Sequence, residues 1–542
     1  MLGRQLSYND GAGNTQTAQY DQLDRPVQFT DSVPSTTTFA YDTSEPRGLP
    51  TSVTDSVAGT FSVTYGADGE PLTEHLPGGY TLTSEYDETG VDTSRIYTRD
   101  SDSAVLLADA VDYSIHGQIV HHTGTTGDTS EQGYTYDKVG RLVGTDDTAA
   151  DGSCTRRAYT FDNNTNRTGL ATSTSAPGAA CTNTGATTVT STYDSADRLM
   201  ATGTAYDAFG RTTTQASGTA VDYYANDMVR RQTTGAQRQT WDLDAAGRLA
   251  SWTTESQNPD TTWSQTGSKT NHYGSDSDSP SWMTDNTAGT VVRNVRGMGG
   301  QLQALTTATG DTVLQLTTIH GDVNVQLPLD TTKSPTVLRQ DEYGNPVAGS
   351  PTARYGWLGG AQRSSETPSG AILMGVRLYD PSLGRFLSVD PIAGGNANAY
   401  DYSVADPMNR VDLDGKWHRW RTSYRFYGRI VGHSWKYFDY WGWDAGWHIG
   451  SSVYIYFNWW ATKKIANEGP YVLGLWGFVA TIIAVINEWV GLVLYIIGAY
   501  AAWFTWWAYR AKERGQCLRL FATFKWVGYH WASNVYPSYL RC

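Results

Sequence analysis

The sequence predicts a mainly β protein, in which a long, curled antiparallel sheet over residues 1–370 is followed by a small C-terminal domain with an apolar helical hairpin. Two observations support this fold class. A Tyr-Asp turn motif recurs through the first 370 residues, between runs of alternating Thr, Ser and Val. Near the C-terminus, residues 471–509 are apolar, with one main interruption at Asn487-Glu488.

The repeat unit is clearest at residues 136–142, which read Tyr-Asp-x-x-Gly-Arg-Leu. Related units begin at Tyr193 and Tyr206, and the early units follow one another at about twenty to twenty-seven residues, the range of a stacked repeat. Asp and Gly favour the turn, Arg can pair with Asp, and Tyr and Leu fall on one face of the flanking strands. Because a single hairpin is only marginally stable, we expect the units to stack edge to edge.

Residues 371–416 form a separate unit, which we call the core block. Two short alternating runs, at residues 376–379 and 385–389, predict strands. Three Asp-Pro pairs predict fixed turns with carboxylates at their corners, and they begin at Asp380, Asp390 and Asp406. The block ends in Asp412-Leu413-Asp414-Gly415.

The core block resembles the RHS-repeat-associated core of bacterial RHS/YD-repeat proteins. The matching residues are Arg377-Leu378-Tyr379-Asp380-Pro381, Gly384-Arg385-Phe386-Leu387-Ser388, Asp390-Pro391, Asn398, Tyr400, Tyr402 and Asp406-Pro407. The resemblance implies that the repeats form a cocoon-like β shell, complete or incomplete. It also implies that the chain after the core is the variable toxin of a bacterial polymorphic toxin, of the kind used in interbacterial competition.

Many members of this family cut themselves just after a terminal Asp-Pro-x-Gly-Leu with a pair of aspartates. The corresponding segment here has Leu413 in place of the proline and Lys416 in place of the leucine. The resemblance implies self-cleavage between Lys416 and Trp417, with an aspartate pair that can divide the roles of acid and base. The predicted site residues are Asp390 and Asp412, with Arg385 as an orienting residue, and the rival carboxylates are Asp380, Asp406 and Asp414.

Charge is distributed unevenly along the chain. Residues 1–416 carry 27 Lys and Arg against 49 Asp and Glu, a formal charge of −22, whereas residues 417–542 carry 13 against 5, a charge of +8. The two parts therefore attract each other, which is consistent with an acidic container for a basic cargo. An acidic solvated surface beside an unrelated basic domain is the alternative.

The four cysteines are isolated from one another, without the spacing of a metal site. Cys154 and Cys181 flank a Thr- and Ser-rich insertion that a disulfide could staple, and Cys517 and Cys542 could tie down the C-terminus, but sequence does not select among the three connectivities. Such pairings suit a secreted or cell-surface protein. No signal peptide is visible, and residue 1 lies inside what reads as a repeat.

The apolar stretch of the tail favours action on a membrane. Its two parts, residues 471–486 and 489–509, would be helices of roughly 24 and 32 Å, close to the ~30 Å hydrocarbon thickness of a bilayer. Many of the tail's 15 tryptophans fall near the ends of these segments, as expected for an interfacial belt. We therefore predict that the tail inserts as a helical hairpin and makes the membrane leaky. Two buried helices of a soluble domain, or a membrane anchor without toxicity, are alternatives.

A nuclease tail is the main alternative function. His433, Asp444 and His448 could bind a metal, and His418 or His530 with Lys525 could serve a metal-independent ribonuclease. A non-toxic cell-surface or adhesive repeat protein is a third possibility. His121-His122 and His320 have no neighbours at metal-ligand spacing and are interpreted as solvated or turn residues.

The expected partners follow from the hypothesis of a membrane-active toxin tail. They are a target-cell membrane, a cognate immunity protein, and a delivery partner or a missing N-terminal part. The preferred reading involves no cofactor, no metal and no nucleic acid.

Overall fold

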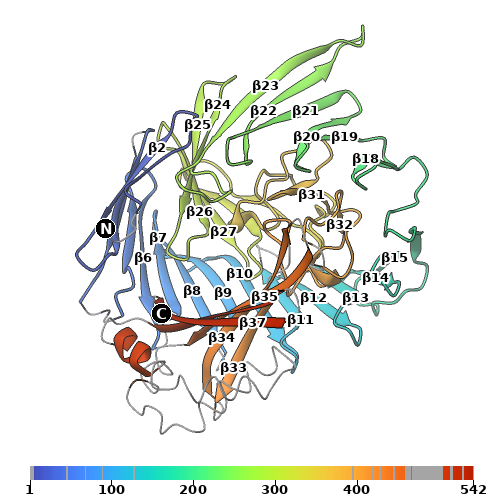
Figure 1. The fold of residues 1–542 in the computed structure, drawn as a ribbon. Coiled ribbons are helices and arrows are strands. Elements are labelled where there is room, and N and C mark those ends of the chain that lie inside the picture. Colours follow the sequence, from blue (N-terminus) through green and yellow to red (C-terminus); the bar gives the residue numbers. More distant parts are fainter. Residues whose placement is uncertain are drawn as a thin grey trace.

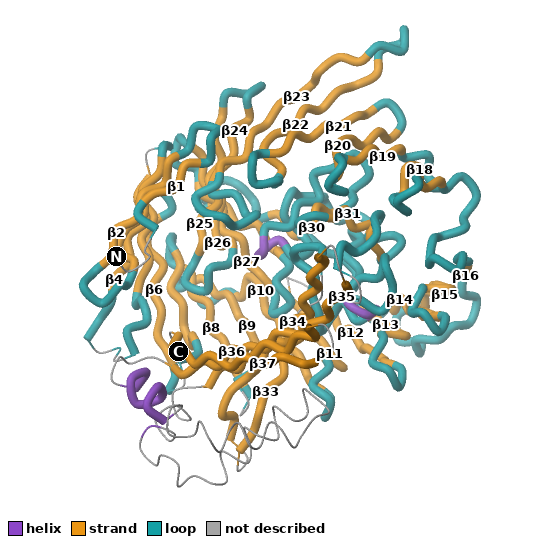
Figure 2. Tube along the Cα trace, viewed as in Figure 1, coloured by secondary structure: helices purple, strands orange, loops and turns teal. Residues whose placement is uncertain are grey.

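The computed structural model describes residues 5–416, apart from residues 34, 44, 46, 68, 88–89, 126–128 and 393–395. Beyond residue 416 it describes five strands, residue 466 and a helix at 505–512. Antiparallel sheets dominate this described part, as Figures 1 and 2 show. The mainly β fold class predicted from the repeats is therefore confirmed.

Sixteen strands form the first sheet, and they lie in the sheet in the order in which they occur in the chain. Each neighbouring pair is antiparallel, as expected of hairpins stacked edge to edge. The strands are β1 (Ser7–Asn9), β2 (Thr15–Tyr20), β3 (Pro26–Asp31), β4 (Ser35–Ala40), β5 (Ser52–Asp55), β6 (Gly59–Tyr65), β7 (Pro71–Leu76), β8 (Tyr80–Tyr86), β9 (Asp92–Arg99), β10 (Val105–Tyr113), β11 (Ile119–Thr125), β12 (Thr129–Tyr136), β13 (Leu142–Thr148), β14 (Cys154–Phe161), β15 (Arg167–Ser175) and β16 (Thr187–Thr190).

Thirteen further strands form the second sheet, again in chain order and antiparallel. Within the described residues up to 370, the only helix is the 3-10 turn η1 (Gly359–Ala361). The strands are β17 (Ala205–Tyr206), β18 (Thr212–Thr214), β19 (Ala220–Tyr223), β20 (Val229–Thr234), β21 (Gln237–Leu243), β22 (Leu249–Gln257), β23 (Trp263–His272), β24 (Trp282–Asp285), β25 (Thr290–Arg296), β26 (Leu302–Thr307), β27 (Thr312–Thr317), β28 (Val323–Pro328) and β29 (Thr336–Val337).

The division into two sheets corrects the expectation of one continuous sheet over residues 1–370. The break lies at residues 191–204, which contain an isolated bridge between Tyr193 and Leu199. The Tyr-Asp turns at Tyr193 and Tyr206 follow each other more closely than the early repeats do, which leaves too few residues for a full outgoing and returning strand. Instead, the Tyr206 hydroxyl accepts the backbone N–H of Leu199 at 2.8 Å.

The aspartate holds each Tyr-Asp turn together. At Asp137, one carboxylate oxygen accepts the backbone N–H groups of Val139 and Arg141, each at 3.0 Å, and the other accepts Arg141 Nε at 2.7 Å. Gly140 has a φ of +89°, which glycine adopts without steric cost. The same aspartate-to-arginine pairing recurs at Asp21, Asp194, Asp207 and Asp244. The pairing predicted for the repeat is thus present.

These turns lie along one rim of each sheet, which we call the turn rim. In the first sheet they follow even-numbered strands and in the second sheet odd-numbered strands, and alternate connections of an antiparallel sheet share an edge. Neighbouring turns are bonded to one another. The Tyr65 hydroxyl donates to the carbonyl of Pro50 at 2.8 Å, and Arg141 Nη1 donates to the carbonyl of Asp162 at 2.8 Å. The repeat residues therefore stabilise both the turn and the stack.

The two sheets also pack against each other. Phe61, Tyr97 and Leu107 of the first sheet share a buried cluster with Leu314 and Val325 of the second. Polar contacts continue this seam, and they include Arg293 with Asp31, Glu74 with Gln303 and Arg157 with Glu342.

Two histidines that the sequence suggested were solvated or turn residues lie beside this seam. The His122 side chain is 18% exposed, and His320 does lie in a turn, with its side chain 8% exposed. His122 Nε2 binds the carboxylate of Asp109, and that charge raises the pKa of His122 although burial alone would lower it. His320 lies in the turn after β27, with Nδ1 3.0 Å from the Asp322 carboxylate and Nε2 2.9 Å from the carbonyl of Pro407. The His320 ring thus ties the second sheet to the core block, whereas the His122 ring is bonded within the first sheet.

The core block contains β30 (Ile372–Met374), β31 (Arg377–Asp380), β32 (Arg385–Phe386) and the 3-10 turn η2 (Ser403–Ala405). In Figure 1, β31 and β32 lie inside the curve of the two sheets. Tyr379, Phe386 and Tyr402 pack with Trp357 in an aromatic cluster. The block is bonded to the turn rim, for example where Asn409 Oδ1 accepts the backbone N–H of Ile119 at 2.7 Å.

The described part of the tail is mainly a five-stranded antiparallel sheet, together with the short helix at 505–512. The strands are β33 (Trp420–Phe426), β34 (Arg429–Trp443), β35 (Gly446–Phe457), β36 (Cys517–Val527) and β37 (His530–Leu540). The predicted hairpin at 471–486 and 489–509 lies outside the described residues, except for positions 505–509. Among the helices that are described, none has the length and apolar character needed to cross a bilayer.

Candidate active site

The core block brings Asp390 and Asp412 to a single guanidinium. Arg377 Nη2 lies 3.0 Å from Asp390 Oδ2 and 2.9 Å from Asp412 Oδ2. Asn396 supplies a second shared donor, with its Nδ2 3.0 Å from Asp390 Oδ2 and 3.5 Å from Asp412 Oδ2. The two aspartates predicted as a pair are therefore neighbours, and their catalytic role stays a prediction.

Local backbone geometry explains why these groups meet. Arg377 begins β31, and its guanidinium lies 3.6 Å from the centroid of the Phe386 ring on β32. Gly375 and Gly415 have φ values of +55° and +65°, and a Cβ on either would lie 2.3 Å from a backbone oxygen of the facing segment. The two glycines therefore allow the end of the core block to pack directly against the start of β31.

The pair is closed off from solvent. The side chain of Asp412 is 0% exposed and that of Arg377 is 1% exposed. Burial raises the pKa of Asp390, and the Arg377 guanidinium offsets only part of this effect. Arg377 Nε and Nη1 are buried and have no hydrogen-bond partner within the described part of the chain. The guanidinium therefore retains N–H groups that can bind an oxygen developing negative charge beside the pair.

The backbone amide of Lys416 lies at the same place. It donates to Asp412 Oδ1 at 3.1 Å and to Asp414 Oδ1 at 3.2 Å. These bonds hold the residue that carries the predicted scissile carbonyl close to Asp412. Burial, and then the charge of Asp412, raise the pKa of Asp414.

Arg385, the predicted orienting residue, makes its contacts elsewhere. Its Nη2 donates to the carbonyl of Asp197 at 2.6 Å, and its guanidinium lies 4.8 Å from the ring centroid of Tyr400. The reason is strand alternation. Arg385 pairs with Asp380, so these two side chains lie on one face of the small sheet, whereas Arg377 lies on the other face. Arg385 thus fixes the core block to the turn rim, and the structure places Arg377 beside the aspartates.

Two of the rival carboxylates cap turns. Asp380 Oδ1 accepts the backbone N–H of Ser382 at 2.9 Å, and Asp406 Oδ1 accepts Nδ2 of Asn409 at 2.7 Å. These bonds match the turn role that the sequence offered as the alternative for the Asp-Pro pairs. Asp414 is the rival that lies next to the pair.

Sequence reasoning missed Arg377 and Asn396 as members of the site. Arg377 stands in the motif Arg377-Leu378-Tyr379-Asp380-Pro381, so it was visible as a matching residue, but no local spacing connects it to Asp412 at the other end of the block. Asn396 lies in an irregular segment without a strand or helix pattern. Only the folded chain shows that both side chains reach the pair.

The tail histidines do not form the metal site considered from the sequence. His433 of β34 pairs with Tyr456 and His448 of β35 pairs with Trp441, so eight strand positions separate them. At about 3.3 Å per residue this is roughly 26 Å along the sheet, too far for one metal ion. Asp444 and His418 lie outside the described residues, whereas His530 pairs with Val527, two positions from Lys525.

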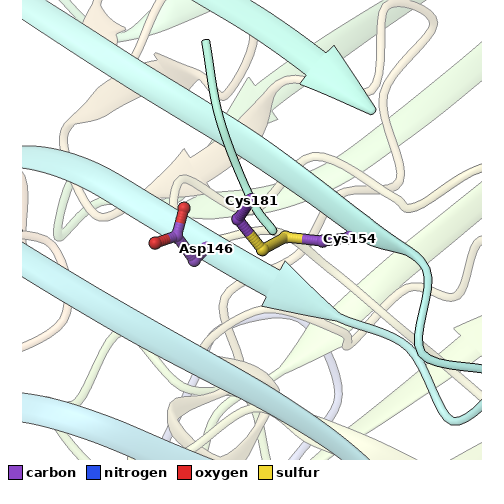
Figure 3. A group of neighbouring side chains, drawn as sticks. All are labelled: Asp146, Cys154 and Cys181. Atoms are coloured by element: carbon purple, nitrogen blue, oxygen red, sulfur yellow. A yellow bond between two sulfur atoms is a disulfide. The ribbon is translucent and has the colours of Figure 1, made fainter. Parts of the chain in front are cut away.

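A group of possible metal ligands in the first sheet is accounted for by a disulfide. Asp146, Cys154 and Cys181 lie together in Figure 3, with their ligand atoms within 4.8 Å of one another. The two sulfurs are bonded at 1.97 Å, so neither is a free thiolate. The bond staples the loop after β15 to the start of β14, which is the staple that the sequence suggested. Asp146 binds Arg156.

Comparison with known proteins supports the fold. No protein-family model and no curated protein matches the sequence. Crystal structures of TcdB2-TccC3, one of them with Cdc42, align with 74% of this chain at 18% identity, with TM-scores of 0.60 and 0.61. A Tc holotoxin pore from Photorhabdus luminescens, in which TccC3 carries an aspartate-to-alanine substitution, aligns at 19% identity with a TM-score of 0.60.

The chain spans about a fifth of the length of these neighbours, since 21–22% of each aligned chain is covered. At this identity the likeness concerns the fold alone, and it supports the RHS-type fold expected from the core block.

Proposed function

We propose that this chain is the carrier shell of a secreted toxin and that it cuts itself between Lys416 and Trp417 to free the tail at 417–542. The observation that carries the proposal is the buried pair of Asp390 and Asp412, which share the donors of Arg377 and Asn396. The fold shared with TcdB2-TccC3, together with the opposite charges of the shell and the tail, supports the carrier role.

The mechanism requires one water molecule and no cofactor. Two carboxylates in contact share one proton, so one is a base and the other an acid. The ionised carboxylate takes a proton from the water molecule. At the same time, the oxygen of that water bonds to the Lys416 carbonyl carbon. The acid then protonates the nitrogen of Trp417, and the C–N bond breaks to leave a carboxyl group and an amine. The buried N–H groups of Arg377 are suited to stabilise the oxyanion between these steps.

Intact-mass analysis of the purified full chain tests the cut. The wild type should give two fragments that separate between Lys416 and Trp417, while Asp412→Asn and Asp390→Asn should each leave one uncut species. Asp380→Asn is the matched control, because that aspartate caps a turn in the same block. A wild-type chain that stays whole, or an Asp412→Asn chain that is still cut, would contradict the proposal.

We also propose that the tail acts on a target membrane, on the basis of the apolar segments at 471–486 and 489–509 and their cationic flanks. The freed tail should release dye from anionic liposomes, and Glu488→Leu should change this leakage more than His433→Ala or His448→Ala. Sealed liposomes together with degraded RNA would favour the ribonuclease alternative, for which Lys525 and His530 lie on adjacent strands.

The proposed partners follow from the same hypothesis. A tail that harms membranes requires a cognate immunity protein or enclosure in the shell before release. Delivery to another cell requires a further component, and the TcdB2-TccC3 neighbours are themselves complexes. The disulfide between Cys154 and Cys181 is consistent with an oxidising, extracellular location.

A further inference from the structure

We propose that Asp414 is a third acid of the site, which anchors the Lys416 amide together with Asp412 and keeps a proton on the Asp390–Asp412 pair at neutral pH. This inference rests on the proposed self-cleavage and assigns a role to a residue outside the aspartate pair.

The position of Asp414 is fixed by the backbone. Its carbonyl accepts the N–H of Val376 at 3.0 Å, beside the close approach of Gly375 and Gly415. Its carboxylate accepts the N–H of Lys416, which also donates to Asp412. The two carboxylates are therefore both hydrogen-bonded to the same backbone nitrogen, that of Lys416. Moving either carboxylate would disturb the residue whose carbonyl is to be attacked.

Unlike the sealed pair, Asp414 borders a cavity of about 360 Å³ between the core block and the second sheet. Among the acidic residues of the site, Asp414 therefore lines a cavity that water can enter, while Asp412 is fully buried. The titratable and charged groups that line the cavity are Arg248, Tyr273, Asp276, Asp278, Arg354, Tyr355, Arg363, Glu366, Asp414 and Lys416.

Most of the facing charges are compensated within the cavity wall. Arg363 binds Asp278 with N–O distances of 2.6 and 2.9 Å, and Arg354 Nη1 lies 3.6 Å from Glu366 Oε2. Arg248 pairs with Asp244 at 2.7 Å. Two charges beside Asp414 remain, and they act in opposite directions. The charge of Asp412 opposes the ionisation of Asp414, and it outweighs the charge of Lys416, which favours it.

The effect on the reaction follows from the sign of this repulsion. A carboxylate beside the pair makes loss of the pair's remaining proton less favourable, so the monoprotonated state persists to higher pH. The alkaline limit of self-cleavage should therefore lie higher with Asp414 than without it. If this alkaline limit moves by one pH unit, the cleavage rate on the alkaline side of the pH–rate profile changes tenfold.

The experiment follows self-cleavage of the freshly synthesised full chain by intact mass at pH 5 to 9. Asp414→Ser keeps a hydroxyl acceptor for the Lys416 amide and removes the charge. We expect about a tenfold slower cut at pH 8 and a rate within about twofold of wild type at pH 5. Asp414→Glu should restore the pH 8 rate, and Asp276→Asn, on the same cavity wall, should match wild type throughout. An equal loss at every pH, or no loss at pH 8, would overturn the inference.

A second measurement does not depend on cleavage. In the Asp390→Asn chain, adding Asp414→Ser should raise the urea midpoint more at pH 8 than at pH 5, because the two carboxylates repel only when both are ionised. No pH-dependent gain would refute the inference while leaving the proposed cut intact. A wild-type chain that is not cut at any pH would refute the proposed function and, with it, the kinetic role of Asp414.

Discussion

Replacement of Arg157 by leucine should weaken the polar seam along which the two sheets pack. Arg157 donates to the Glu342 carboxylate three times, at 2.7, 2.9 and 3.0 Å, and the Glu342 side chain is 1% exposed. Arg157→Leu leaves this carboxylate buried with Tyr159 as its remaining side-chain hydrogen-bond partner among the described residues. Because an uncompensated buried charge costs about 3–5 kcal/mol, we expect that loss of unfolding free energy at neutral pH.

The pH dependence of this loss has a definite sign. Burial alone would raise the pKa of Glu342, but Arg157 and Tyr159 outweigh it and the pKa is lowered. In the wild type, the stability from Glu342 is therefore present above its unfolded pKa and disappears as the pH falls below it. In the Arg157→Leu chain, burial raises the pKa of Glu342, so the ionisation of Glu342 lowers the unfolding free energy as the pH rises. The difference between the two proteins should therefore grow from pH 5 to pH 8.

Urea unfolding of the full chain, followed by tryptophan fluorescence in an Asp412→Asn background, measures this effect. Adding Glu342→Leu should recover most of the loss, because a buried ion pair can be replaced by apolar side chains at little net cost. Arg99→Ala is the control, since Arg99 and Asp102 are 44% and 50% exposed and their pair should contribute less than about 1 kcal/mol. An Arg157→Leu cost below about 1 kcal/mol, an equal cost at both pH values, or no recovery in the double variant would refute the reasoning.

Three further predictions concern single features of the two sheets and the core block. Asp137→Ala removes an acceptor of two backbone N–H groups and should destabilise the chain by about 2–4 kcal/mol in urea unfolding, whereas Asp151→Ala, in an exposed turn, should leave the urea midpoint close to that of wild type. Burial raises the pKa of Asp401 to about 7, so its ionisation destabilises the fold as the pH rises; Asp401→Asn should raise the thermal midpoint relative to wild type at pH 8 but not at pH 4. Reduction of Cys154–Cys181, which are 27 residues apart, should cost about 3–4 kcal/mol in urea unfolding, and this loss should be absent when the reductant is added to a Cys154→Ser/Cys181→Ser chain.

Local patterns carried the prediction of the repeats. The Tyr-Asp-x-x-Gly-Arg unit specifies its own turn, since Asp137 binds residues only two and four positions away and Gly140 takes the left-handed conformation between them. The mainly β class followed from repetition of that unit. In the core block, matching residues also pointed to Asp390 and Asp412 as a pair.

The tail shows where such reasoning stopped. The β-branched and aromatic run at residues 453–457 lies within β35, while the predicted hairpin at 471–486 and 489–509 lies almost wholly outside the described residues. Hydrophobicity measures how strongly a segment avoids water, and by itself it does not distinguish a bilayer from a protein core.

The amino-acid sequence alone determined the short-range structure of this protein, because the hydrogen bonds of its turns join residues within one repeat. Tertiary structure decided which distant groups meet. It separated the sheets at 191–204, paired Arg157 with Glu342, and placed Arg377 rather than Arg385 between the two aspartates. The physical reason is that these contacts depend on which face of a strand each residue occupies and on how strands far apart in the chain pack.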